Sequence, residues 1–363
     1  MTTALVIGGT GPTGHYIVNG LIERGYEVAI LHTGRHEVDE IPPTVEHIHT
    51  NPFDAVELAQ AVDGRVWDLA IATYGRLRTV AATMVGRTGQ FMSIGGGPAY
   101  RGYMNAKATY PQGMLVPVPE SAPKTRSEEE DGKGYRVLKS EEVVFDLHPN
   151  ATHFRYPYIY GKYQIVPREW PIVRRILDGR RELILPDGGH YLNHHGAAAN
   201  MAHAVLLAVD QPQAASGQIY NCGDERVLSL AQVVQVVCDG LEAQLDVISM
   251  PYEFALAARP MVGQPWTSHR VFDLTKIKAE LGYEDIVDPV VALQEAARWL
   301  RDNPIGAAGE RGLQDPFDYA AEDRLIRSWR EATAGLVDPG YERTPGYTGS
   351  YSGPGGSVRK SDW

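Results

Sequence analysis

Cysteine is scarce in this sequence of 363 residues, with only Cys222 and Cys238 present. Two cysteines are too few for a disulfide framework or a cysteine-ligated zinc cluster. No apolar run approaches the roughly 20 residues that cross a membrane, and the N-terminus lacks a basic flank followed by an apolar core. Basic residues are outnumbered too: the formal net charge of −11 argues against a nucleic-acid or anionic-membrane surface. These absences predict a cytoplasmic protein with no nucleic-acid and no membrane partner.

Glycine, by contrast, is concentrated in a turn near the N-terminus. The apolar run Ala4–Ile7 suits a strand buried on both faces of a parallel sheet, and it leads through Gly8–Gly14 into a helical pattern over His15–Arg24. Strand, glycine turn and helix in this order are the context of a dinucleotide-binding fingerprint, although GxxGxxG differs from the commoner GxGxxG. An ordinary glycine turn is the alternative. We expect the cofactor diphosphate to be held by Gly8, Thr10, Gly11, Pro12, Thr13 and Gly14.

Short apolar runs alternate with helical stretches along the first part of the chain. The runs are 4–7, 27–31, 66–73 and 89–94. This alternation predicts an α/β fold with a Rossmann-type doubly wound parallel sheet and a smaller C-terminal substrate-binding portion. We expect a dinucleotide-binding domain over 1–160, whose sheet later segments can complete, a mainly substrate-binding portion over 161–304 and an extension over 305–363. The Gly/Pro/Ser/Tyr-rich end cannot fold alone, so the extension is either flexible or packed on a neighbour.

The residues after the second predicted strand indicate which dinucleotide is bound. Sites that prefer NAD usually place Asp or Glu there for the ribose hydroxyls, whereas this chain has His32–His36, without a carboxylate. The side chains of Thr33 and Arg35 could bind a 2′-phosphate by donating hydrogen bonds to it. The sequence therefore predicts NADP as the cofactor, with NAD as the alternative if Arg35 is only a solvated loop residue.

Tyr135 and Lys139 form a YxxxK pattern in a predicted helix over Tyr135–Asp146. Residues four apart share one helical face, so the ammonium of Lys139 would lie beside the phenol of Tyr135 and favour its phenolate form. A tyrosine tuned in this way can act as a general acid–base, and Lys139 can also bind the nicotinamide ribose. Since a Tyr and a Lys four apart occur often by chance, a solvated pair is the alternative.

Taken in order, these motifs resemble the extended short-chain dehydrogenases/reductases of the NAD-dependent epimerase/dehydratase group. The likeness covers residues 2 to about 300. It implies that the sheet domain holds the dinucleotide, that Tyr135 transfers the proton, that Lys139 orients it, and that the chain around Tyr156 meets the nicotinamide amide. It also implies a homodimer. The matching segments are Gly8–Gly14, Trp67–Asp68, Tyr100, Pro119–Glu120, Tyr135–Lys139, Arg155–Gly161 and Gly217–Gly223 followed by Ser229–Leu230.

Two positions depart from the pattern of that group. Gly96 stands where the group usually has a Ser or Thr whose hydroxyl holds the substrate oxygen. Ser93, or a backbone N–H of Gly96 or Gly97, would have to replace that hydroxyl, unless catalysis has been lost. Asn51 stands where an acidic residue is common, so an amide would contact the adenine.

Other polar and aromatic residues are candidates for the substrate side. His190, His194 and His195 lie in GGHYLNHHG without a carboxylate pattern such as HExxH, so we predict no metal site and expect His194 to contact substrate. Arg168, Arg174 and Arg175 would suit an anionic substrate or a solvated helix face. Tyr74 and Tyr163 would serve as aromatic walls or as ordinary packing residues.

Together these features predict an NAD(P)-dependent oxidoreductase or epimerase that transfers hydride at a hydroxyl/carbonyl carbon of a small substrate, with Tyr135 as acid–base. The alternative, favoured by Gly96, is a non-catalytic dinucleotide-binding regulatory or RNA-associated protein of the same fold. The identity of the substrate stays open among sugar nucleotides, sugar acids and aromatic or terpenoid ketones.

Overall fold

The computed structural model describes residues 2–73, 75–263, 265–336 and 340–342. It consists of two compact units, residues 1–317 and 318–363. In the second unit, the described structure is the helix α13 (Tyr319–Thr333), whose first turn is capped by the side chain of Asp318 at 3.0 Å from the Ala321 amide. Among the described residues, no helix is both long and apolar enough to pass through a membrane.

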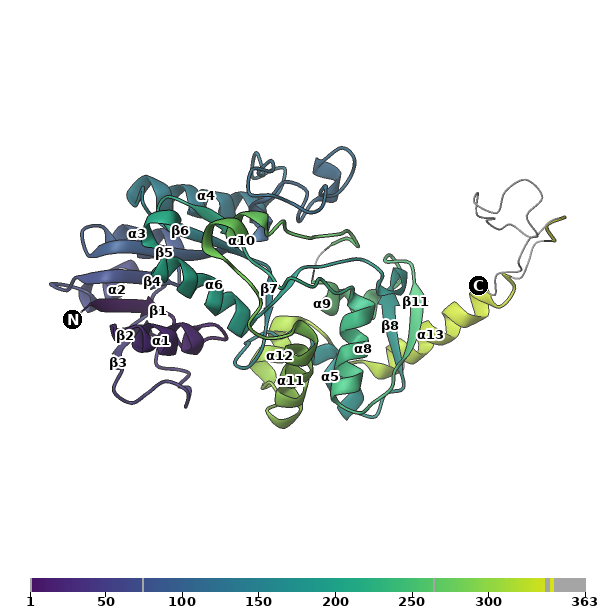
Figure 1. The fold of residues 1–363 in the computed structure, drawn as a ribbon. Helices are drawn as coiled ribbons and strands as arrows, with labels where there is room; N and C mark the ends of the chain where they lie inside the picture. Colours follow the sequence, from purple (N-terminus) through teal and green to yellow (C-terminus); the bar gives the residue numbers. More distant parts are fainter. Residues whose placement is uncertain (1, 74, 264, 337–339, 343–363) are drawn as a thin grey trace, which may run out of the picture. The chain divides into compact units, whose positions relative to one another are not determined.

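A seven-stranded parallel sheet forms the centre of the first unit (Figure 1). The strand order is β10-β6-β5-β4-β1-β2-β3. From β1, the strands β2 and β3 are added on one side and β4, β5 and β6 on the other, so the strand order switches between β1 and β4. Ligands of such sheets bind beyond the carboxyl ends of the strands at this switch point. The doubly wound α/β fold expected from the sequence is therefore confirmed. The strands are β1 (Thr3–Ile7), β2 (Glu27–His32), β3 (Glu46–His49), β4 (Trp67–Ala72), β5 (Thr88–Gly96), β6 (Thr152–Tyr156) and β10 (Ile219–Asn221).

Alternate residues of the strands supply two hydrophobic cores, one on each face of the sheet. In β1, Ala4 and Val6 pack with helices α1 and α6, whereas Leu5 and Ile7 pack with α2, α3 and α4. This is the period of two that a strand imposes on its side chains. The helices are α1 (Gly14–Glu23), α6 (Ala198–Asp210), α2 (Ala55–Ala61), α3 (Leu77–Met84) and α4 (Gly132–Leu147).

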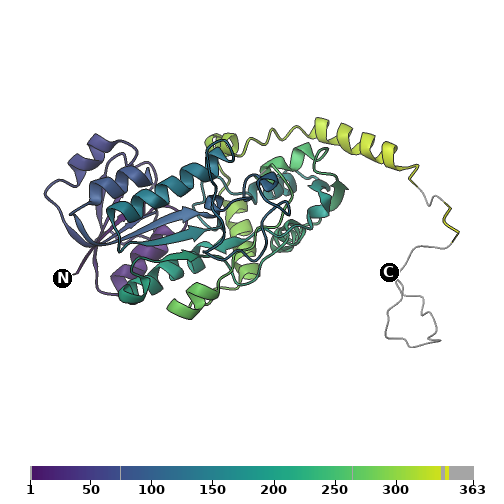
Figure 2. The same ribbon diagram turned by 90° about the horizontal axis from the view of Figure 1, so that it is seen from above.

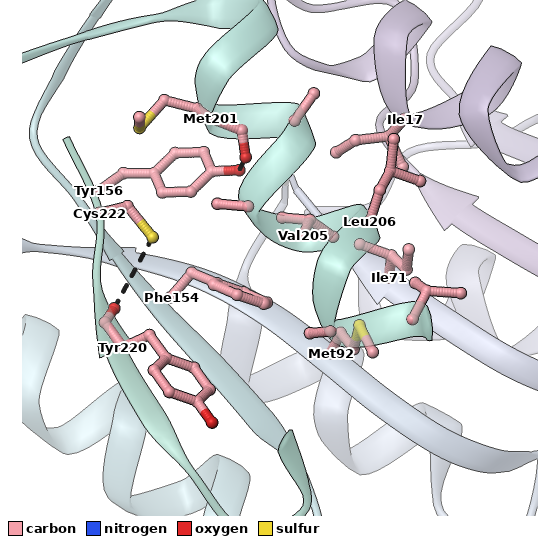
Figure 3. Packing of buried hydrophobic residues seen from close by; sticks show 14 of the residues in the cluster. Ile17, Ile71, Met92, Phe154, Tyr156, Met201, Val205, Leu206, Tyr220 and Cys222 are labelled. Carbon is pink, nitrogen blue, oxygen red and sulfur yellow. Dashed lines mark hydrogen bonds between the residues drawn. The ribbon is translucent and has the colours of Figure 1, made fainter. Parts of the chain in front are cut away.

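Helix α6 seals the first of these cores. Figure 3 shows Val205 and Leu206 of α6 directed towards Ile17 of α1, and Phe154 lying beneath the same helix. Gly20 in α1 allows this close packing, because a Cβ there would lie 2.3 Å from Leu206 Cδ1. The two helices are thereby fixed against the sheet on the same face.

Within the first unit, the segments from residue 158 onward gather beyond the carboxyl ends of the strands, except α6, α7, β10 and α10, which lie along or beside the sheet (Figures 1 and 2). Their strands pair in parallel as β7 with β9 and β8 with β11. The elements are β7 (Tyr158–Tyr160), α5 (Trp170–Leu177), β8 (Glu182–Pro186), β9 (His195–Ala197), α7 (Pro212–Ala215), α8 (Leu230–Gly240), β11 (Asp246–Met250), α9 (Arg259–Val262), α10 (Thr275–Leu281), α11 (Pro289–Asp302) and α12 (Ala307–Leu313).

The boundaries at residues 160 and 304 that we expected from the sequence both lie inside the first unit. A later segment, β10, does complete the sheet. Helix α12 also belongs to the first unit, although it lies in the portion expected to be an extension. The Gly/Pro/Ser/Tyr-rich end from residue 343 onward lies outside the described residues.

Candidate functional site

The glycine turn between β1 and α1 has a shape that leaves room for a ligand. Gly8 and Gly9 have φ values of +117° and +86°, which side-chain-bearing residues rarely adopt. A Cβ on Gly14 would lie 2.3 Å from the carbonyl oxygen of Gly9, so Gly14 is needed to close the turn. A Cβ on Gly11 would meet no atom within 4 Å. Gly11 therefore faces open space at the position where a diphosphate would approach.

The N-terminus of α1 completes this cradle. Its N-cap residue, Thr13, makes no side-chain capping bond, and the first turn carries no acidic residue. The first amides of a helix lack partners within the helix and carry a partial positive charge, so they favour an anion. The loop residues predicted to hold the diphosphate are thus brought together, and they fit such a group.

A cavity of about 530 Å³ lies at the carboxyl ends of β4 and β5, between the starts of α3 and α4. Four of its lining side chains are cationic and, in the described part of the chain, none of its lining residues is a carboxylate. Such a lining favours an anionic ligand. It is formed by Gly75, Arg76, Leu77, Arg78, Thr79, Ile94, Gly95, Gly96, Lys133, Arg136, Val137, Ser140 and His153.

Tyr135 and Lys139 do meet on one face of α4, as predicted, with the ammonium 5.3 Å from the ring centre. That face is not the one that lines the cavity. Consecutive helical residues are turned by about 100°, so Tyr135 and Lys139 lie roughly opposite Val137. The side chain of Lys139 is 42% exposed and pairs with Glu142 at 2.5 Å, and Tyr135 is partly exposed. The structure thus joins the predicted pair but leaves it away from this cavity.

The orientation of α4 is fixed by a buried ion pair. Arg155 of β6 is 1% exposed and binds both carboxylate oxygens of Glu141, at 2.9 and 2.5 Å. It also donates to the hydroxyl of Tyr100 at 2.8 Å, which in turn donates to Asn221 at 2.6 Å. Although burial raises the pKa of Glu141, the bonds and charge of Arg155 outweigh it, and the pKa lies below its usual value. Glu141 lies on the face of Lys133 and Val137, so the pair directs that face inward.

Ser93, the nearest hydroxyl to Gly96 in the sequence, is fully buried. Its Oγ lies 2.7 Å from Nδ1 of His153, whose pKa burial lowers to about 4. Gly96 lines the cavity, and a Cβ there would meet only Pro98 Cδ at 3.3 Å and the Tyr156 carbonyl oxygen at 3.5 Å. Gly97, by contrast, has no room for a Cβ, which would lie 2.4 Å from the ring of Phe272. Of the three residues considered for the substrate oxygen, the structure places Gly96 at the cavity.

The other residues predicted to contact the cofactor lie in different environments. Thr33 and Arg35 are exposed in the loop after β2. The Asn51 side-chain oxygen accepts the Phe53 amide at 3.1 Å, which leaves the Asn51 amide group for a ligand. Tyr156 is buried against α6 and its hydroxyl donates to the Met201 carbonyl at 2.8 Å (Figure 3). Its side chain thus serves the core, not the cavity.

His194 is also held inside the protein. It is 2% exposed, its Nε2 lies 2.7 Å from the carbonyl of Asp224, and its Nδ1 accepts the amide of Phe272 at 2.9 Å. Both ring nitrogens are therefore engaged by the backbone. Tyr163, which the sequence suggested as an aromatic wall of the substrate site, donates its hydroxyl to the Glu40 carboxylate at 2.6 Å. Tyr74, the other residue suggested for that role, lies outside the described residues.

Arg168, a candidate from the sequence, interacts electrostatically with two cations that the sequence did not single out, Lys133 and Arg270. Arg270 is 1% exposed, and burial together with the nearby charge of Arg168 lowers its pKa to about 10. Burial and Arg168 likewise lower the pKa of Lys133. Nη2 of Arg270 and Nη1 of Arg168 are buried without a hydrogen-bond partner among the described residues. A buried N–H group without a partner is costly, so these two nitrogen atoms are candidates for binding an anion.

The other two arginines suggested by the sequence, Arg174 and Arg175, already form ion pairs with carboxylates. Arg175 is buried and pairs with Asp315 at 2.8 Å, while Arg174 binds Asp178 at 2.7 Å and Glu310 at 2.8 Å. Of the three arginines singled out in the sequence, Arg168 is the one with a buried N–H group lacking a partner in the described structure.

Comparisons with known proteins give one match in sequence and many in structure. No protein-family model matches the chain. An uncharacterized protein of Escherichia coli K12, YbjS, is 26% identical over 186 residues, a match that covers 45% of this chain and 55% of that protein. The chain thus matches only about half the length of this curated relative.

Solved structures resemble the chain over most of its length at low identity. UDP-glucose 4-epimerase of Thermotoga maritima has a TM-score of 0.66 and 17% identity, covering 83% of this chain and 99% of its own. WbmG of Bordetella bronchiseptica in complex with NAD gives 0.65 and 14%, covering 84% and 96%. dTDP-glucose 4,6-dehydratase of Bacillus anthracis in complex with NAD gives 0.64 and 13%, covering 84% and 98%. The chain therefore has the fold of the extended short-chain dehydrogenase/reductase epimerases and dehydratases, as the resemblance in its sequence implied.

Proposed function

We propose that this protein binds a nicotinamide dinucleotide and is an oxidoreductase or epimerase acting on a small anionic substrate. The observation that carries the proposal is the turn at Gly8–Gly14, which is open at Gly11 and ends at an uncapped, acid-free helix N-terminus. The structurally similar WbmG and dTDP-glucose dehydratase were solved in complex with NAD. A bound nicotinamide dinucleotide supplies hydride transfer at a hydroxyl/carbonyl carbon.

The preference for NADP over NAD is a finer part of this proposal. The loop after β2 presents Thr33 and Arg35 to solvent and has no carboxylate within His32–His36. A guanidinium binds a 2′-phosphate, whereas an acidic residue there would repel it. We expect Arg35→Ala to weaken binding of NADP and to leave binding of NAD unchanged.

The substrate class follows from the cations around the cavity. Lys133 lines it, and the charge of Arg168 acts on both Lys133 and Arg270. UDP-glucose is bound in the similar Thermotoga epimerase structure, and a sugar nucleotide carries a diphosphate that can accept hydrogen bonds from the N–H groups of Arg168 and Arg270 that lack a partner among the described residues. We therefore place a sugar nucleotide or another phosphorylated small molecule first among the substrates.

Two residues of α4 can supply the acid–base group of the proposed chemistry. Tyr135 and Lys139 carry the sequence pattern, but Lys133 is the α4 residue that lines the cavity and has a lowered pKa. A lysine whose pKa is lowered exchanges a proton with a substrate oxygen more readily than an ordinary lysine does. Both residues are therefore candidates, and variants distinguish them.

A second function is favoured by the position of Tyr135 and Lys139 away from the cavity and by the missing side chain at Gly96. In that case the protein binds a dinucleotide and regulates a partner without catalysis. The alternative keeps the glycine turn and needs none of the acid–base groups.

One set of measurements tests both functions. Thermal unfolding with NADP or NAD should show a rise in melting temperature, because a ligand that binds only the native state stabilises it. Turnover of cofactor with sugar nucleotides, or their epimerisation, is then compared in wild type, Tyr135→Phe and Lys133→Met. Loss of turnover with cofactor binding retained identifies the acid–base residue. Binding without turnover of any substrate supports the regulatory function, and no stabilisation by either dinucleotide refutes the proposal.

A further inference from the structure

Three histidines and one glutamate converge at the edge of the sheet, beside the predicted ribose site. His32 ends β2, Glu37 lies in the following loop, and His47 and His49 belong to β3. Residues two apart on a strand point to the same face, so His47 and His49 project together. Pairing of β3 with the end of β2 then brings His32 alongside them.

Four of the distances between ligand atoms of these side chains are close to those of a metal-binding tetrahedron, and the widest separation has to shorten when an ion binds. Nε2 of His32 lies 3.2 Å from Nδ1 of His47, which lies 3.1 Å from a carboxylate oxygen of Glu37. The other carboxylate oxygen of Glu37, Oε1, lies 3.3 Å from Nε2 of His49 and 3.7 Å from Nε2 of His32. All four ligand atoms are within 4.8 Å of one another. Ligands bound tetrahedrally to zinc at their usual bond lengths are separated by roughly 3.3 Å.

Hydrogen bonds alone do not satisfy this arrangement. The amide of Gly34 donates to Nδ1 of His32 at 3.3 Å, so a neutral His32 carries its proton on Nε2 and directs it to Nδ1 of His47. Nδ1 of His47 is then an acceptor, yet it also faces the carboxylate of Glu37, which is an acceptor too. A cation between these atoms removes the conflict. Coordination through Nε2 moves the His32 proton to Nδ1, and the exposed amide of Gly34 then turns to solvent.

We propose that these four side chains form a binding site for one Zn²⁺ ion. Imidazole nitrogens with a single carboxylate suit zinc, whereas Mg²⁺ and Ca²⁺ prefer sites made of oxygen ligands. Because the protein supplies all four ligands, the site is of the closed, structural type and not a catalytic one. The argument for a zinc ion at this site does not depend on the proposed enzymatic activity.

The ion would tie the loop between β2 and β3 to the sheet. Glu37 is the ligand contributed by that loop, and its side chain is 52% exposed. Thr33 and Arg35 lie in the same loop, so the ion would also restrict the segment predicted to meet the ribose.

The experiment uses the full chain after treatment with a chelator. Zn²⁺ binding is measured by titration calorimetry, and Co²⁺ serves as a coloured probe of tetrahedral geometry. His49→Gln and Glu37→Gln remove exposed ligands, with side chains 56% and 52% exposed, so both variants are expected to fold. His36→Gln is the matched control, because His36 is an exposed histidine of the same loop outside the cluster.

Wild type and His36→Gln should bind one Zn²⁺ per chain and melt at a higher temperature with zinc than without it. His49→Gln and Glu37→Gln should bind at least about tenfold more weakly and lose most of the thermal shift. Circular dichroism without metal verifies that the variants are folded. The proposal is overturned if wild type binds no zinc with one-to-one stoichiometry, or if the cluster variants bind it as well as the control does.

Discussion

His194 offers a quantitative test of how the part beyond the sheet is held together. Its ring bridges two backbone segments, through Nε2 to the Asp224 carbonyl and through Nδ1 to the Phe272 amide. A proton added to Nδ1 would break the second bond and place a charge in a site that is 2% exposed. His194 therefore stabilises the fold only while it is neutral.

The size of the effect follows from the pKa. Burial lowers the pKa of His194 from 6.5 to about 4. Between these values the unfolded chain binds a proton that the native protein does not, so stability rises with pH by about 1.4 kcal/mol per unit. The contribution is present above pH 6.5 and is lost as the pH falls towards 4. Acidification from pH 7 to pH 4.5 should thus remove about 2–3 kcal/mol through this residue alone.

His194→Gln isolates that contribution. At pH 7 the variant leaves the Phe272 amide without its partner, which costs about 1–3 kcal/mol. The difference in unfolding free energy between wild type and variant should then shrink by about 2–3 kcal/mol on going to pH 4.5, because the variant lacks the titrating group. Urea unfolding followed by circular dichroism at several pH values measures this difference. A difference that stays constant with pH would mean that His194 takes up its proton equally in both states, which would refute the reasoning.

Two further substitutions test the ion pair and the glycine turn. Glu141→Ala should lower the free energy of unfolding by about 3–5 kcal/mol, because Arg155 would remain buried without its carboxylate. Glu142→Ala is its control: Glu142 pairs with Lys139 on the exposed face, and its loss should cost at most about 1 kcal/mol. An equal cost for the two in urea unfolding would contradict the assignment of the buried face. Gly11→Ala should unfold at the same temperature as wild type, because the new Cβ meets no protein atom within 4 Å. It should nevertheless lose the rise in melting temperature that NADP or NAD causes, because the Cβ would occupy the space proposed for the diphosphate. A rise that is retained would show that the dinucleotide does not approach Gly11.

The fold was largely predictable because its strands are continuous apolar runs. The run at 4–7 corresponds to β1 and the run at 89–94 lies within β5. The helix expected over Tyr135–Asp146 is part of α4, which begins earlier, at Gly132, because the side chain of Asp131 caps its first turn by accepting the Gly134 amide at 2.9 Å. Strand β3 was not predicted because its sequence, Glu-His-Ile-His, has a single buried residue, Ile48, and so contains no run of apolar residues.

The candidate site was less predictable, for two physical reasons. A spacing of four shows that Tyr135 and Lys139 share a helical face, but packing decides which face turns inward. Here the bond from Glu141 to Arg155 makes that decision, and Arg155 is fourteen residues away on another element. The second reason is that ligand sites combine distant segments. Nothing in the sequence around Arg270 indicates that it lies within the electrostatic influence of Arg168.

The orientation of α4 has a consequence for the chemistry that the fold can support. If hydride transfer takes place at the ends of β4 and β5, the accompanying proton must be handled by a group that reaches this cavity. Of the titratable groups in its lining, His153 is fully buried and bonded to Ser93, and the arginines stay protonated. Lys133 is then the group in this lining that is suited to the task. The relative effects of the Lys133→Met and Tyr135→Phe substitutions on turnover therefore report directly on which face of this helix meets the substrate.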